Sequence, residues 1–203
     1  RPWFTPGLLG PLALTFSAVS LWATVTLASH FLPGWASTQV SGEAGPEGFL
    51  DALNTTHRVL LALNVTLLAP VVEEFVFRGM LMRRWIAARG FWPGIVGSAV
   101  VFSLLHPPNW LGSFAFGIVA GVLYLWSGSL LLPILAHVIN NLFVTLTILA
   151  GELAPSEPEP VPTIDELQAQ WLMPVIMLLL AATVVAAVVR PLVPGARARA
   201  DTI

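Results

Sequence analysis

The chain has 203 residues, of which 56% are hydrophobic and only 10% are charged, and its mean hydropathy is +0.82. Average soluble domains carry roughly 25% charged residues, so this composition excludes a water-soluble globule and a disordered chain. Eleven acidic residues against nine arginines leave a net charge of -2, so there is no basic face for nucleic acid, and the absence of cysteine excludes thiol chemistry. We therefore expect one integral-membrane domain over residues 1–203.

Six continuous apolar stretches are candidates for membrane-spanning helices, which need roughly 20 residues each. In chain order they cover residues 8–32, 59–82, 91–106, 111–126, 129–150 and 171–189. The second contains charges and Pro70, at which we expect a kink. The predicted fold class is an all-α, polytopic transmembrane helical bundle of about six spans.

The segments outside these stretches differ in composition. The first stretch is longer than the apolar part of a secretory signal and lacks a small-residue cleavage site, so we interpret it as a retained span. Residues 33–57 and 151–170 are rich in Gly, Pro, Ser and acids. Such segments bury little apolar area, and we expect extended, mobile loops there.

The arginines predict the orientation of the chain. Threading six spans puts seven of the nine on one side: Arg1, Arg83, Arg84, Arg89, Arg190, Arg197 and Arg199. Loops rich in Arg and Lys stay in the cytoplasm, so we expect both termini to be cytoplasmic, in a plasma membrane of bacterial type.

Several polar residues stand where only apolar ones are expected. An ionisable group near the middle of a membrane costs about 2.5–3.5 kcal/mol on insertion scales and usually marks a functional site. The second, third and fifth stretches contain such groups or amides: Glu73, Glu74, Arg78, His106, His137, Asn140 and Asn141.

Helical spacing assigns different roles to the two glutamates. Glu74 and Arg78 are four residues apart and share a helix face, so they can form an ion pair that offsets the cost of burying each charge. Glu73 lies about 100° around the helix from Glu74 and gains no such neighbour. We expect Glu73 to be free for chemistry.

The remaining polar residues lie on two other spans. His137 and Asn141 are also four residues apart and project together. His106 directly precedes Pro107 and Pro108, which end or kink a helix. Asn140 and Asn64 are interpreted as interhelical hydrogen-bonding residues, and the small residues 117–121 as an internal helix contact.

Three short motifs now stand in order on three predicted spans. Residues 73–78 read EEFVFR, residues 102–106 read FSLLH and residues 137–141 read HVINN. They match the EExxxR, FxxxH and HxxxN motifs, and the chain therefore resembles the CAAX prenyl endopeptidase and bacteriocin-processing family, also called CPBP or Abi. We place the motif-bearing core at residues 57–150.

The resemblance implies an intramembrane endopeptidase that acts on a membrane-associated protein or peptide, with its active site inside the bilayer. Carried over by motif, Glu73 is the general base that activates water and His106 assists it. His137 and Asn141 polarise the scissile carbonyl and stabilise the oxyanion. Glu74 and Arg78 support the site or contact substrate.

Two alternatives use the same residues. Glu73, His106 and His137 could form a His₂Glu zinc site, although Asn141 is a poor zinc ligand, and we expect no metal and no cofactor. A non-catalytic immunity or scaffold protein could also keep this fold. His106 lies about 22 Å along its span, whereas Glu73 and His137 lie at about 12–15 Å. A tilted third span, or a loop at Pro107 that dips into the protein, would bring them together.

Overall fold

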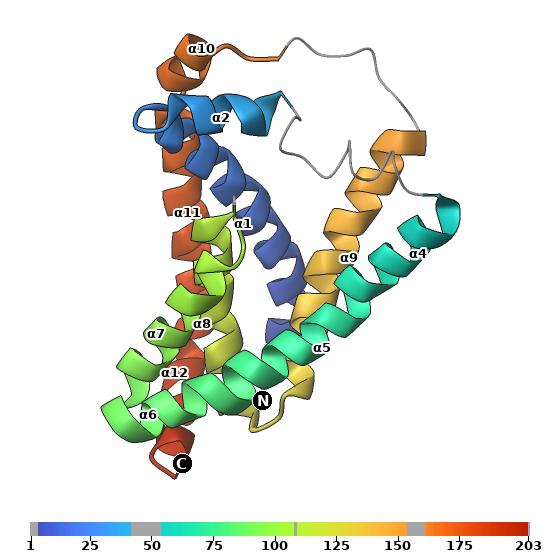
Figure 1. Ribbon diagram of the computed structural model, residues 1–203. Coiled ribbons are helices and arrows are strands. Elements are labelled where there is room, and N and C mark those ends of the chain that lie inside the picture. Colours follow the sequence, from blue (N-terminus) through green and yellow to red (C-terminus); the bar gives the residue numbers. More distant parts are fainter. Residues whose placement is uncertain (1–3, 42–53, 108, 154–160, 203) are drawn as a thin grey trace.

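A computed structural model describes residues 4–41, 54–107, 109–153 and 161–202 (Figure 1). Over these ranges every regular element is a helix and none is a strand. The predicted all-α transmembrane bundle is confirmed. The end of α6, the helix α12 and the C-terminus lie at one end of the molecule, and α2 and α10 lie at the other (Figure 1).

Four helical stretches of the described residues are long and apolar enough to cross a membrane: 55–89, 110–127, 131–150 and 172–200. Helices α8 (Trp110–Ser127), α9 (Leu131–Leu153) and α11 (Leu172–Val189) account for three of them. Beyond α11 the last stretch continues as η3 (Arg190–Leu192) and α12 (Val193–Ala200). The first predicted span is α1 (Phe4–Ser29), with 26 residues, and the third is the shorter apolar helix α7 (Phe91–Leu104).

The second span is one continuous helical stretch with two π-helical parts. It comprises α4 (Thr55–Leu63), η1 (Asn64–Leu68), α5 (Ala69–Glu74), η2 (Phe75–Met82) and α6 (Arg83–Arg89). Pro70 stands in the first turn of α5, directly after the first π-helical part. Pro70 therefore marks a change of hydrogen-bonding register and does not end the helix.

Helix α7 is too short to cross the bilayer, because 14 residues at about 1.5 Å each extend only about 21 Å. It begins at Gly90, whose φ of 89° turns the chain directly from α6 into α7. Helix α8 packs closely on α7: a Cβ added at Gly117 would meet Ala99 at 2.8 Å. At Gly121 it would meet Met82 and Ile95. The internal contact predicted for residues 117–121 is confirmed.

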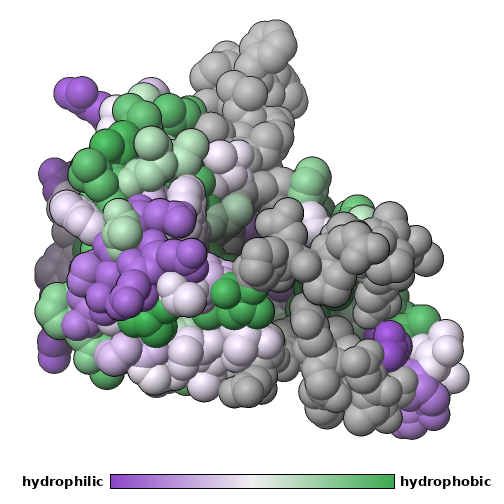
Figure 2. All heavy atoms as spheres, turned by 90° about the horizontal axis from the view of Figure 1, so that it is seen from above, coloured by the Kyte–Doolittle hydropathy of each residue, from purple (hydrophilic) through white to green (hydrophobic). Residues whose placement is uncertain are grey.

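The prediction of two extended loops is wrong for their described parts, because each contains a helix. Helix α2 (Pro33–Val40) follows α1, and α10 (Ile164–Ala169) precedes α11. They are stable because Ala36 and Leu167 bury their side chains together with Val25 of α1. Hydrophilic residues gather on part of the end that these helices cover (Figure 2). Residues 42–53 and 154–160 of the two loops lie outside the described ranges.

Helix α10 begins with a capping box, which the loop composition concealed. The backbone N–H and the hydroxyl of Thr163 donate to the Glu166 carboxylate at 2.8 and 3.0 Å, and the Glu166 N–H donates to the Thr163 hydroxyl. These hydrogen bonds hold the pKa of Glu166 below its ordinary value, and the one from the Thr163 backbone N–H has the largest effect.

Candidate active site

The centre of the site is the buried ion pair that the sequence predicts. Arg78 Nη1 donates to Glu74 Oε1 at 2.6 Å, and the two side chains are 1% and 0% exposed. The guanidinium also donates to the Gly117 carbonyl at 3.4 Å and lies 4.6 Å from the centre of the Phe102 ring. Arg78 therefore joins η2 to α7 and α8, and the pairing of Glu74 with Arg78 is confirmed.

Glu74 has a second partner that spacing along the chain does not reveal. His137 of α9 places Nδ1 2.9 Å from the same Oε1 atom, and its side chain is buried. Because a carboxylate paired with Arg78 is ionised and can only accept, His137 Nδ1 carries a proton. Glu74 thus fixes the orientation of the His137 ring.

Glu73 faces the two imidazoles, with no such partner on its own helix. Its Oε2 atom lies 3.5 Å from His106 Nε2 and 3.7 Å from His137 Nε2. This oxygen is buried and has no hydrogen-bond partner among the described residues. Residues from all three motifs therefore meet at one carboxylate.

His106 lies in the turn that follows α7, two residues beyond the end of the helix. Its Nδ1 is 2.7 Å from the Phe102 carbonyl, and its ring stacks on Phe102 with a centroid distance of 4.2 Å. Because a carbonyl only accepts, His106 Nδ1 also carries a proton, and its Nε2 is directed at Glu73. The early end of α7 brings His106 to Glu73, as the alternative of a loop at Pro107 predicts.

The turn that carries His106 is held by contacts with distant helices. The Ser103 hydroxyl donates to the Trp110 carbonyl at 3.0 Å, and the Ser20 hydroxyl donates to Asn109 Oδ1 at 2.8 Å. The Trp110 ring stacks on Trp35 of α2 at 5.5 Å between centroids. Sequence analysis assigned no role to these residues, since Ser103 occupies a variable position of the second motif and the others stand in no motif and carry no charge.

Asn141 lies on the same side of α9 as His137 but bonds to another helix. Its Nδ2 donates to the Val65 carbonyl of η1 at 2.9 Å. The Ala69 N–H donates to the Asn64 carbonyl, five residues earlier, as in a π-helix. In the same register the Val65 carbonyl would accept a hydrogen bond from the backbone N–H of residue 70, which is Pro70. Proline has no N–H, so Asn141 satisfies a carbonyl that Pro70 leaves free.

The interhelical hydrogen bonds predicted for Asn140 and Asn64 are not formed. Asn140 Nδ2 donates to Asn141 Oδ1 at 3.2 Å, a contact within α9. The Asn64 side chain is exposed and makes no hydrogen bond to any described residue. Neither position is close enough to a polar group of a neighbouring helix.

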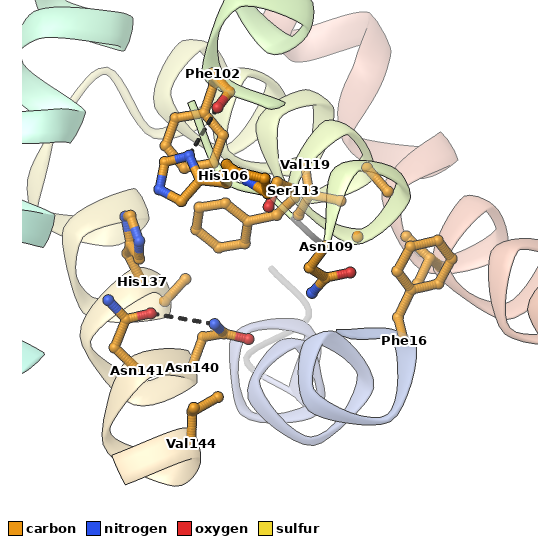
Figure 3. Close-up of a pocket in the computed structure, with 16 residues that line it drawn as sticks. Phe16, Phe102, His106, Asn109, Ser113, Val119, His137, Asn140, Asn141 and Val144 are labelled. Carbon is orange, nitrogen blue, oxygen red and sulfur yellow. Dashed lines mark hydrogen bonds between the residues drawn. The ribbon is translucent and has the colours of Figure 1, made fainter. Parts of the chain in front are cut away.

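A cavity of about 230 Å³ adjoins the two imidazoles (Figure 3). His106 and His137 lie on one side of it, and Asn109 and Phe16 lie on the other (Figure 3). Asn141 also lines this cavity, so the HxxxN motif contributes both His137 and Asn141 to its wall. Over the described residues, no group of three or more His, Cys, Asp or Glu side chains has the geometry of a metal site.

Comparison with known proteins agrees with this geometry. Residues 55–143 match the family described as Type II CAAX prenyl endopeptidase Rce1-like. Neither a curated protein nor a solved structure matches the chain. The matched range contains the three motifs whose residues converge around Glu73. Over residues 55–143, this membrane protein is similar to the type II CAAX prenyl endopeptidase Rce1-like family, which is a family of proteases.

Proposed function

We propose that the protein is an intramembrane endopeptidase that hydrolyses a peptide bond of a membrane-associated protein or peptide by water activated at Glu73. The observation that carries the proposal is the convergence of His106 Nε2 and His137 Nε2 on the buried Oε2 of Glu73. The arginines of α6, η3 and α12 favour a cytoplasmic location for that end of the molecule, and the proposal places both termini in the cytoplasm of a bacterial-type plasma membrane.

The proposed reaction follows from which side-chain atoms of the site can bind a proton. Glu73 accepts a proton from water as the oxygen attacks the scissile carbonyl, and His106 Nε2, which faces the carboxylate, shares that proton. As the C–N bond breaks, the same proton passes to the leaving amine. Two carboxylates and one guanidinium leave the site with one negative charge, which a proton on one imidazole neutralises.

The oxyanion in this proposal is stabilised by His137 and Asn141. The protonated His137 ring uses Nδ1 toward Glu74 and directs Nε2–H at the developing charge. Asn141 has a second N–H beyond the one it donates to Val65. Glu74 and Arg78 act as positioning residues, because their ion pair orients the His137 ring.

Replacing Glu73 tests the assignment of the base. Glu73→Gln keeps the size of the side chain but removes its basicity, so peptide cleavage should fall by at least about 10²–10⁴-fold while the melting temperature stays near wild type. Glu166→Gln is the matched control, since Gln also serves in a capping box. Turnover by Glu73→Gln at the wild-type rate would refute the role of Glu73.

Metal content distinguishes this reaction from the zinc alternative. We expect purified protein to contain no stoichiometric transition metal and to keep its activity after exhaustive dialysis against a chelator. One zinc per chain by elemental analysis, with activity lost on its removal and restored on its return, would show that the same three side chains bind zinc. The protease assignment would survive that result.

The non-catalytic alternative makes a different prediction for the same variants. An immunity or scaffold protein would depend on the fold, so Glu73→Gln would leave its biological effect intact in cells. Loss of the effect in Glu73→Gln, together with retention in Glu166→Gln, would favour the enzyme.

A further inference from the structure

The cavity beside the imidazoles extends away from Glu73, toward α1 and α11. Glu73 does not line the cavity, whose apolar lining includes Phe16 of α1, Phe116 and Val119 of α8, and Val185 of α11. Val144 of α9 both lines the cavity and is 43% exposed, so the cavity opens on the side of α9. Ile148, one turn further along the same face of α9, is also exposed and apolar, so an occupant enters from the membrane.

Two polar side chains in this apolar wall have unused hydrogen-bonding capacity. The Ser113 hydroxyl has no hydrogen-bond partner in the part of the chain that the structure describes. Asn140 donates one N–H to Asn141, which leaves its carbonyl oxygen and its second N–H available. Both side chains lie at the cavity (Figure 3). A purely apolar occupant would leave these groups without partners, at a cost in binding free energy.

The volume limits what the cavity can hold. At about 230 Å³ it is smaller than the ~300–1,000 Å³ of sites for drug-sized ligands, so a long lipid chain does not fit inside it. One side chain together with its own backbone amide does fit. Such a residue would place its apolar part against Phe16 and Phe116 and its peptide group beside Asn140 and Ser113.

We propose that this cavity is a subsite for one apolar residue of the peptide substrate, adjacent to the bond that is cut. Asn140 and Ser113 bind its backbone amide, and the wall of Phe16, Ala115 and Val119 sets the size of the accepted side chain. The inference rests on the proposed endopeptidase function and adds a substrate-binding role for residues outside the three motifs.

The test uses one variant that makes the cavity smaller and one that makes it larger. Purified protein in lipid vesicles cleaves a library of single-span peptides randomised around a central bond, and mass spectrometry gives the residues on either side of each cut. Ala115→Leu narrows the cavity and should shift the preference at one flanking position toward Gly and Ala. Phe16→Ala widens it and should shift the same position toward Phe and Trp. The ratio of kcat/KM between small and large peptides should change by about tenfold or more.

Matched variants on the lipid-facing surface serve as controls. Ala186→Leu on α11 and Phe143→Ala on α9 make the same changes at exposed positions and should keep the wild-type preference. Asn140→Leu should lower kcat/KM for every peptide without changing the preferred size. An unchanged Asn140→Leu enzyme would refute the backbone contact.

The outcomes separate this inference from the function on which it rests. Active variants whose preferences equal the wild-type preference would overturn the subsite and leave the endopeptidase assignment intact. An equal loss for all peptides in Ala115→Leu and Phe16→Ala would also overturn it. If Ala115→Leu does not fold, the shift expected for Phe16→Ala decides the question. No cleavage of any peptide by wild-type protein would overturn both proposals.

Discussion

Adjacent glutamates occupy different environments in this site. Glu74 is fully buried and accepts from Arg78 and His137 through one oxygen, whereas Glu73 is 29% exposed and faces two imidazoles. The difference follows from the 100° between successive residues of a helix, which directs neighbouring side chains to different surroundings. One carboxylate is therefore engaged with structural partners, and the other is the one to which we assign the reaction.

Removing Arg78 should destabilise the fold as well as the site. Arg78→Ala leaves the Glu74 carboxylate buried with only His137 as a partner, and breaking a buried pair in this way costs about 3–5 kcal/mol. We expect a lower free energy of unfolding in detergent, measured by denaturant titration. Arg84→Ala, at an exposed position of α6, is the matched control and should unfold like wild type. Equal stability of the two variants would contradict the buried-pair interpretation.

Within elements, each of the two π-helical parts of the long helical stretch 55–89 accepts a hydrogen bond from a neighbouring helix. Val65 in the first part accepts from Asn141 of α9, and Phe77 in the second accepts from Ser98 of α7 at 3.3 Å. A π-helical register shifts backbone bonds by one residue and commonly occurs at functional sites. Both parts thus bind the helix to the two neighbours that carry the imidazoles.

A double-mutant cycle tests the contact at Pro70. Asn141→Leu leaves the Val65 carbonyl without a donor and should lower the free energy of unfolding by about 1–3 kcal/mol. Pro70→Ala supplies a backbone N–H, so adding it to Asn141→Leu should recover part of that loss. Asn64→Leu is the matched control, because the Asn64 side chain makes no hydrogen bond to a described residue. If the effects of Asn141→Leu and Pro70→Ala on the free energy of unfolding add to within about 0.3–0.5 kcal/mol, the two positions are not coupled and the interpretation is refuted.

Across the whole molecule, residues far apart in the chain hold the turn of His106. Ser20 of α1 binds Asn109, and Trp35 of α2 stacks on Trp110. Helices α1 and α2 thus position His106, which lies 86 residues after Ser20 and 71 residues after Trp35, although they carry no motif. Residues outside the match at 55–143 therefore contribute to the geometry of the site.

Loosening this turn should reduce catalysis more than stability. Trp35→Leu removes the stack on Trp110 and lets His106 move, and a displacement of about 1 Å can cost up to about 10²-fold in rate. We expect kcat to fall by at least about tenfold, with KM and the melting temperature close to wild type. Trp35→Phe should restore most of the rate because it keeps a stacked ring. Trp171→Leu, at an exposed position, is the matched control. A parallel fall of kcat and melting temperature would instead indicate a purely structural role for Trp35.

The class of the molecule and the chemical groups of the site can be predicted from the amino-acid sequence alone. Apolar runs require helices in a membrane, since every backbone N–H and C=O needs a partner within its own segment. The spacing of Glu74 and Arg78 fixes their pairing, because residues four apart lie on the same face of a helix wherever that helix is located in the fold. These features depend only on local geometry, so sequence alone predicts them.

How these groups come together depends on the packing of the helices and cannot be predicted from the sequence. The packing of separate helices determines that α7 ends after 14 residues, that His137 binds Glu74 and that Asn141 donates to the Val65 carbonyl. The helices α2 and α10 were missed because both depend on burying Ala36 and Leu167 against α1, and because the capping box of α10 stands in a segment of loop-like composition. Contacts between distant segments leave no periodic pattern in a sequence, and packing alone sets their distances.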